Sequence, residues 1–160
     1  MRGEAGACRA GPYSGCVANI AFSRLRMCFV LVQNKNAATD EEWEKWVAFV
    51  SRGGEASVES MRVLIFSAGG SPTPKQRASI HKLMPQSGGG VSTAIVTASF
   101  IGRSVVSAMN LFNSKVRAFS PDRVSDALDY LDIAAPHRAE LLDLVARLHG
   151  ELDLPLTTHT

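Results

Sequence analysis

Residues 61–77 read Met-Arg-Val-Leu-Ile-Phe-Ser-Ala-Gly-Gly-Ser-Pro-Thr-Pro-Lys-Gln-Arg, and this stretch decides how the rest of the chain is interpreted. Residues 61–67 are the most strand-like run of the sequence, and the glycines that follow allow a turn. Thr73 is followed by Pro74 and, three residues on, by Gln76, which is the pattern of a capping box with proline at the first helical position. The stretch therefore predicts a buried strand, a glycine turn and the capped start of a helix.

The alternation of strand and helix signals continues on both sides of this stretch. Runs of apolar or alternating residues predict further strands at residues 16–22, 27–32, 92–98 and 115–119. Capping residues predict helix starts at Thr39, Thr73, Ser99 and Ser120. At Thr39, Glu42 repeats the capping-box spacing. Pro136 opens a last helix, which we expect over residues 136–150.

Strands that alternate with helices favour a mostly parallel sheet, because crossover connections are right-handed and place helices against the sheet. A turn at residues 23–26 would join the first two strands into an antiparallel hairpin at or near one edge. We therefore predict an α/β fold, with a single mostly parallel sheet of about five strands, an opening β-hairpin, helices on both faces and an extra C-terminal helix. The domain is expected over residues 16–152, between a disordered tail at 1–15 and a frayed end at 153–160.

The composition is that of a globular protein with no nucleic-acid partner. The chain has 160 residues, of which 46% are hydrophobic and 20% charged, which suits one domain with a core. Its 17 basic and 15 acidic residues are interspersed and form no basic stripe with interleaved aromatics. Cys8, Cys16 and Cys28 do not suggest a disulfide framework, so we expect a cytoplasmic location. No apolar run approaches the ~20 residues of a membrane span.

One edge of the predicted sheet is the expected functional face, since ligands bind at the carboxyl ends of strands in open parallel sheets. The loop at residues 67–73 is the richest in polar groups at this edge. Ser67 and Ser71 are candidates for a phosphorylated or partner-docking hydroxyl. The backbone, hydroxyl and basic groups that could bind an anion belong to Gly69, Gly70, Thr73, Lys75, Ser99 and Arg103. A purely structural turn is the simpler interpretation, because capping alone accounts for Thr73.

Several common chemistries are missing from the sequence. It contains no G-x-x-x-x-G-K-[ST] phosphate loop, no G-x-G-x-x-G dinucleotide fingerprint and no G-x-S-x-G nucleophile elbow. The histidines His81, His137, His149 and His159 are not paired at helical spacing, and no C-x-x-C is present. We therefore expect no catalytic residue, no metal and no cofactor, and we favour a protein that is not an enzyme.

The run Val63-Leu64-Ile65-Phe66 leading into a small-residue loop and a helix, together with the opening hairpin and the alternating units, resembles the STAS domain family. This is the module of anti-sigma-factor antagonists and sulphate-transporter tails, with SpoIIAA-like and lipid-binding Sec14-like relatives. The resemblance covers about residues 16–133. It implies a loop after the third strand whose serine or threonine a kinase phosphorylates, here Ser67 or Ser71. The acidic residue and the Gly-Leu pair that are typical of that loop are absent here.

The resemblance and the missing catalytic motifs together favour a non-enzymatic regulatory or protein-interaction module of bacterial type. It would dock another protein through the loop and helix that follow the third strand. The alternative is a small-anion, nucleotide or lipid-binding protein that uses the carboxyl edge of the sheet. The sequence leaves the identity of the partner and the oligomeric state open.

Overall fold

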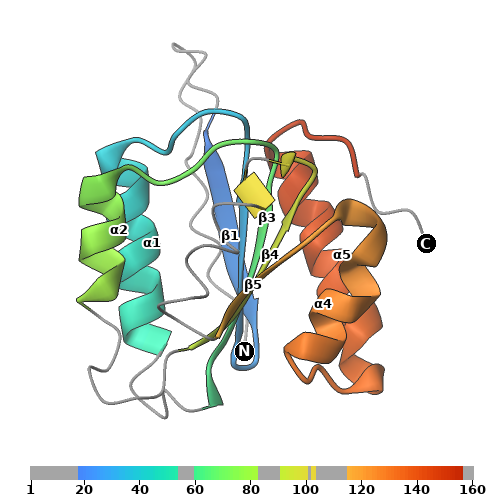
Figure 1. Cartoon of the computed structure of the whole chain (residues 1–160). Helices are drawn as coiled ribbons and strands as arrows, with labels where there is room; N and C mark the ends of the chain where they lie inside the picture. Colours follow the sequence, from blue (N-terminus) through green and yellow to red (C-terminus); the bar gives the residue numbers. More distant parts are fainter. Residues whose placement is uncertain (1–17, 54–59, 83–90, 101, 104–114, 157–160) are drawn as a thin grey trace.

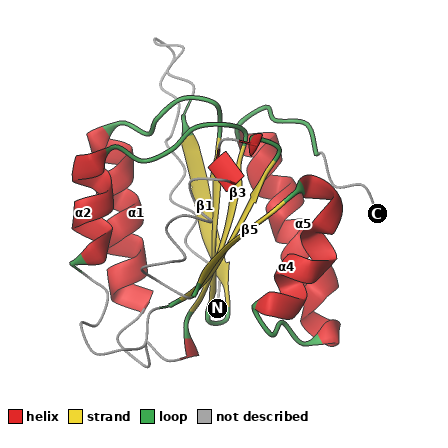
Figure 2. Cartoon of the chain, in the orientation of Figure 1, coloured by secondary structure: helices red, strands yellow, loops and turns green. Residues whose placement is uncertain are grey.

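The computed structural model describes residues 18–53, 60–82, 91–100, 102–103 and 115–156. Its elements in chain order are β1 (Ile20–Leu25), β2 (Cys28–Gln33), α1 (Asp40–Gly53), β3 (Arg62–Ser67), α2 (Pro74–His81), β4 (Ser92–Thr97), β5 (Val116–Phe119), the short 3-10 helix η2 (Pro121–Arg123), α4 (Val124–Tyr130) and α5 (Ala135–Glu151). Figure 2 shows helices on both sides of a central sheet. The tail expected at residues 1–15 and most of the helix expected after Ser99 lie outside the described residues.

The five strands form one sheet in the order β1-β2-β3-β4-β5. β1 pairs with β2 in antiparallel orientation, and the remaining neighbours are parallel. The register sets the strand ends level, because Ser67 pairs with Gln33 on one side and with Thr97 on the other. The predicted α/β architecture with an opening hairpin is therefore confirmed, and the carboxyl ends of β2, β3 and β4 meet at one edge.

The first strand lies further along the chain than the sequence predicts. We expected a strand at 16–22 and a turn at 23–26, whereas β1 continues to Leu25 and the turn consists of Arg26 and Met27. Ser23 and Arg24 suggest a turn because they are polar, but an edge strand tolerates polar residues on its exposed positions. Arg26 has a φ of 53°, and a positive φ in the loop is typical of two-residue hairpins.

Each face of the sheet has its own apolar cluster. Figure 1 shows α1 and α2 on one side of the sheet and α4 and α5 on the other. Trp43 and Trp46 of α1 are buried in the first cluster, and Leu128 of α4 and Leu141 of α5 are buried in the second. β2 lies between the two clusters, and all six of its residues are buried. A strand whose first five residues are apolar fits this position, because it is covered on both faces.

Cys28, at the start of β2, is buried. Burial raises the pKa of its thiol to about 12, although the nearby positive charge of Arg62 opposes this rise. Since the thiolate is the reactive form, Cys28 acts as a small core residue, as its place in an apolar run predicts.

The start of α1 carries the predicted capping box. The Glu42 backbone N–H donates to the Thr39 hydroxyl at 3.2 Å, and the Thr39 N–H donates to the Glu42 carboxylate at 2.8 Å. The same carboxylate accepts the backbone N–H of Asn19 at 2.7 Å. The cap therefore also ties α1 to the residue that precedes β1.

The helix start predicted at Ser120 has a different form. The Ser120 side chain makes no capping hydrogen bond, and Pro121 opens the 3-10 helix η2. The α-helix α4 begins only at Val124. The fixed φ of proline suits a 3-10 turn as well as an α-helix, so the Ser-Pro-Asp signal does not separate the two.

Candidate functional site

The loop between β3 and α2 closes on itself through hydrogen bonds of the Ser67 hydroxyl. This hydroxyl donates to the carbonyl oxygen of Gly70 at 2.7 Å and accepts the backbone N–H of Gly69 at 3.1 Å. The Gly70 N–H donates to the carbonyl oxygen of Asn34, just past β2, at 3.0 Å. Ser67 therefore holds the shape of the loop, and the loop is attached to the neighbouring strand.

Gly69 and Gly70 are each required in this loop, but for different structural reasons. Gly69 has a φ of 128°, which residues with a side chain rarely adopt. A Cβ at Gly70 would lie 2.4 Å from the carbonyl oxygen of Asn36 and 2.5 Å from that of Asn34. Gly70 therefore allows the β3–α2 loop to lie close against the backbone of the loop after β2.

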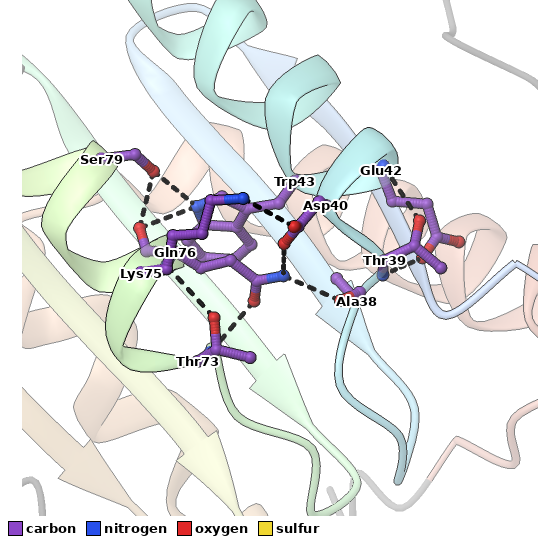
Figure 3. A network of polar contacts seen from close by, with 9 residues as sticks. All are labelled: Ala38, Thr39, Asp40, Glu42, Trp43, Thr73, Lys75, Gln76 and Ser79. Atoms are coloured by element: carbon purple, nitrogen blue, oxygen red, sulfur yellow. Dashed lines mark hydrogen bonds and ion pairs between the residues drawn. The ribbon is translucent and has the colours of Figure 1, made fainter.

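Gln76 links the start of α2 to the start of α1, as Figure 3 shows. Its backbone N–H donates to the Thr73 hydroxyl at 3.2 Å, and its side-chain oxygen accepts the Thr73 N–H at 3.1 Å. The predicted capping box at Thr73 is therefore confirmed. The amide nitrogen of the Gln76 side chain donates to the carbonyl oxygen of Ala38 at 2.8 Å and to the Asp40 carboxylate at 3.3 Å.

Two more contacts cross from α1 to α2 (Figure 3). The indole N–H of Trp43 donates to the carbonyl oxygen of Gln76 at 2.9 Å and to the Ser79 hydroxyl at 3.0 Å. The Lys75 ammonium lies 2.8 Å from the Asp40 carboxylate, and both side chains are exposed. Their hydrogen bond lowers the pKa of Asp40 and raises the pKa of Lys75. An anion bound by Lys75 would therefore compete with Asp40 for its charge.

The residues after β4 lie at the same edge of the sheet. The Gly102 N–H donates to the Ser99 hydroxyl at 3.0 Å, so Ser99 caps the residues that follow, as predicted. Arg103 donates to the carbonyl oxygen of Thr97 at 2.9 Å, and its guanidinium lies 6.0 Å from the centre of the Phe100 ring. Phe100 is 75% exposed. The edge thus presents an aromatic ring beside an arginine, and the sequence analysis did not single out this ring.

A cavity of about 200 Å³ lies at the carboxyl edge, between the strand ends and the C-terminal end of α5. Its lining combines apolar and polar residues: Gln33, Phe66, Ser67, Ala68, Val96, Thr97, Ala98, Pro121, His149, Leu154 and Pro155. Among the predicted site residues, Ser67 lines this cavity. Those that do not line it are Gly69, Gly70, Ser71, Thr73, Lys75, Ser99 and Arg103.

His149 is one of the cavity residues that the sequence analysis missed, since it was considered there only as a metal ligand. It is 7% exposed and lies on the inward face of α5, with Leu141, Val145 and Leu148. Its Nδ1 lies 2.8 Å from the carbonyl oxygen of Val145, and its ring meets the Phe66 ring edge to face at 5.3 Å. An imidazole within an apolar stripe is the signal that could have found it.

The described residues were also compared with the requirements of a metal site and of a membrane-spanning helix. Within them, no group of three or more His, Cys, Asp and Glu side chains is placed to hold a metal ion. In the same part of the chain, no helix has the length and apolarity needed to cross a membrane. The cavity is lined by hydroxyl, amide and imidazole groups, which bind by hydrogen bonds.

Comparisons with known proteins bear on the fold. No family model and no curated protein matches the chain. Among solved structures, the chain is similar to the crystal structure of an uncharacterised DUF3478-family protein with a SpoIIAA-like fold from Shewanella loihica PV-4. The TM-score is 0.53 at 20% sequence identity, over 74% of this chain and 98% of the other. The element order and the sheet topology agree with this similarity, and the chain therefore has a SpoIIAA-like fold.

Proposed function

We propose that this protein is a non-enzymatic regulatory module of the cytoplasm that docks another protein through the β3–α2 loop and α2. The supporting observation is that the loop and α2 are hydrogen-bonded to α1 on their buried side and expose other residues to solvent. Gln76 and Trp43 brace the loop and helix from behind, whereas Gly69, Ser71 and Lys75 are exposed. A surface that is already ordered loses little conformational entropy on binding, which favours affinity.

Within this surface, Ser71 is the hydroxyl we assign to regulation. Ser71 is exposed, whereas the Ser67 hydroxyl is engaged on both its donor and its acceptor side within the loop. A phosphate on Ser71 would add up to about two negative charges to the docking surface. On Ser67 it would break the hydrogen bonds that close the loop. Phe100, exposed at the same edge, supplies an apolar contact of the kind that is enriched at interfaces.

Site-specific photo-crosslinking tests this proposal. One variant carries p-benzoylphenylalanine in place of Ser71, and a control carries it in place of Arg147, which is exposed on α5 on the opposite face of the sheet. In cells of the source organism, we expect a defined protein adduct at position 71 that is absent at position 147. A second pair of proteins carries the crosslinker in place of Phe100, with and without Ser71→Asp. The aspartate should change the yield of the adduct that forms at position 100. No adduct at position 71, or the same adducts at both positions, would contradict the docking surface.

The second candidate function is binding of a small ligand at the carboxyl edge, and the cavity beside α5 is the observation that favours it. Its volume of about 200 Å³ lies below the ~300–1,000 Å³ of pockets for drug-sized molecules. Lys75 and Arg103, predicted for anion binding, do not line it. These facts favour a small molecule over a nucleotide or a lipid. A thermal-shift screen tests this candidate, since a compound that stabilises the wild type should lose its effect in Thr97→Val but not in Lys75→Ala.

A further inference from the structure

Buried polar side chains gather at the cavity beside α5. The described part of the chain buries the polar residues Gln33, Asn34, Gln76, Thr97 and His149. Three of these, Gln33, Thr97 and His149, line the cavity. They come from β2, β4 and α5, which are far apart in sequence and which the fold brings together.

The two buried polar residues outside the cavity are fully hydrogen-bonded. The side-chain amide of Asn34 donates to Ala18 and Asn19, each at 3.3 Å, and its oxygen accepts the Asn36 N–H at 2.8 Å. The side chain of Gln76 likewise uses both donor hydrogens and its oxygen within the chain. Such pairing is the rule for buried polar groups in folded proteins.

Each of the three cavity residues, in contrast, has at least one donor or acceptor that no described residue satisfies. Gln33 donates one amide hydrogen to the carbonyl oxygen of Asn36 at 3.2 Å, and neither its second amide hydrogen nor its side-chain oxygen has a partner among the described residues. The Thr97 hydroxyl accepts the Ser99 N–H at 3.2 Å but donates to no atom of these residues.

His149 follows the same pattern. A carbonyl oxygen can only accept, so Nδ1 of His149 carries the hydrogen that is donated to Val145. In the neutral imidazole, Nε2 is then an acceptor, and the described residues offer it no donor. Two donors, on Gln33 and Thr97, and two acceptors, on Gln33 and His149, are therefore left over around a single cavity.

We propose that this cavity binds a small uncharged molecule that carries both a hydrogen-bond donor and an acceptor on one end, such as a carboxamide or an alcohol, and a short apolar group on the other. Thr97 donates to the oxygen of the ligand, and Gln33 and His149 accept its N–H or O–H hydrogens. Phe66, Val96 and Leu154 enclose the apolar part.

The charge and size of the cavity define this class of ligand. Its lining contains no Asp, Glu, Lys or Arg, and a buried ion without a counter-charge is strongly disfavoured. A volume of about 200 Å³, compared with the ~30 Å³ that each molecule occupies in liquid water, leaves room for about seven non-hydrogen atoms. The inference rests on the second candidate function, and it is independent of the docking surface.

Titration with isovaleramide, followed by two-dimensional NMR of the ¹⁵N-labelled protein, tests the proposal. Isovalerate has the same shape with a negative charge, and 3-methylbutan-1-ol tests the alcohol form. We expect isovaleramide or the alcohol to shift the amide signals of Thr97, Ala98 and His149 in a saturable way. The dissociation constant of the better of the two should be at least about fivefold lower than that of isovalerate, because isovalerate must bury its charge.

Two variants locate the binding site. Thr97→Val keeps the shape but removes the hydroxyl, and His149→Phe keeps a ring but removes the acceptor, so each should weaken binding of the better ligand about threefold to tenfold. Arg147→Ala, exposed on α5 and outside the cavity lining, should leave binding unchanged.

The possible outcomes separate the ligand class from the site itself. Tighter binding of isovalerate at the same signals would overturn the uncharged class while the second candidate function stands. If none of the three compounds shifts these signals at concentrations on the order of 50 mM, the cavity holds only water. The uncharged ligand class and the second candidate function are then both wrong, and the docking surface is unaffected. Binding that survives both cavity variants would place the site elsewhere.

Discussion

The junction between the starts of α1 and α2 and the cavity beside α5 both bury polar side chains, but they differ in how completely these are bonded. At the junction, Gln76 uses two donor hydrogens and its side-chain oxygen within the chain. At the cavity, the Thr97 hydroxyl accepts one hydrogen bond, and the described residues give its O–H no acceptor. Gln76 is 3% exposed and Thr97 is 4% exposed, so burial does not distinguish them.

The difference teaches how to separate a polar group that supports the fold from one that serves a ligand. The fold accounts for a group that is fully bonded within the chain, whereas an incompletely bonded group requires a further partner. Under the two proposals, the junction braces the docking surface, and a small molecule completes the hydrogen bonding at the cavity. The two regions should therefore respond differently when polar side chains are replaced by apolar ones.

The largest effect should come from Gln76→Leu. This change leaves the carbonyl oxygen of Ala38 and the N–H of Thr73 without their partner, and we expect it to lower the free energy of unfolding by about 3 kcal/mol. Urea denaturation monitored by tryptophan fluorescence measures this. The matched control is Gln33→Leu, equally buried but with one hydrogen bond to lose, for which we expect about 1 kcal/mol. Equal losses in the two variants would break the comparison.

A second, somewhat smaller effect is expected for Gly70→Ala. The added Cβ would meet two backbone carbonyl oxygens at less than 3 Å, and the loop after β2 must shift at a cost of about 2 kcal/mol. Gly150 on α5 is the control, because a Cβ there would meet nothing within 4 Å, and alanine should be neutral or stabilising. The same urea denaturation measures both variants. A neutral Gly70→Ala would show that the loop is not held against its neighbour.

The acid dependence of stability should reveal the capping carboxylate of α1. Burial alone would raise the pKa of Glu42, but hydrogen bonds from Asn19 and Thr39 lower it overall below its ordinary value of 4.5. A lowered pKa means that this stabilisation is complete above pH 4.5 and is lost as the pH falls through the folded-state value. Urea midpoints measured between pH 7 and pH 3 should therefore fall less in Glu42→Gln than in the wild type. Parallel curves for the two proteins would contradict this contribution.

The smallest change in stability is expected for His149→Phe. The imidazole makes one hydrogen bond, to a carbonyl oxygen of its own helix, so an aromatic ring of similar shape should change the free energy of unfolding by less than about 1 kcal/mol in either direction. The same variant should lose ligand affinity, which separates stability from binding. A loss as large as that expected for Gln76→Leu would mean that His149 supports the fold rather than a ligand.

Local signals in the sequence predicted much of this fold. The capping boxes at Thr39 and Thr73 are complete within four residues, and the apolar run in β2 needs no distant partner to be recognised. The predicted bounds of β1 were wrong because an edge strand accepts residues such as Arg24 that are also typical of turns. Polarity alone does not distinguish the two environments.

The candidate site was harder to predict, because its parts are distant in sequence. Gln33, Thr97 and His149 meet only after the sheet has formed and α5 has packed on it. No spacing rule connects them, and only His149, an imidazole in the apolar stripe of α5, stands out in its own segment. Ser67 was predicted at the right edge because topology alone brings the carboxyl ends of parallel strands together.

The position of α5 affects when the first strands can be covered during synthesis of the chain. α5 packs on β1 and β2, so it covers two strands that precede it by about 100 residues in the chain and are translated before it. A ribosome synthesises the chain from its N-terminus at about 5–20 residues per second. One face of those strands therefore stays without its cover until Leu141, Val145 and Leu148 have been synthesised. The cavity also needs α5, because His149 lines it, so the cavity is complete only after α5 has docked. A small molecule that binds there would therefore stabilise only chains in which α5 is in place.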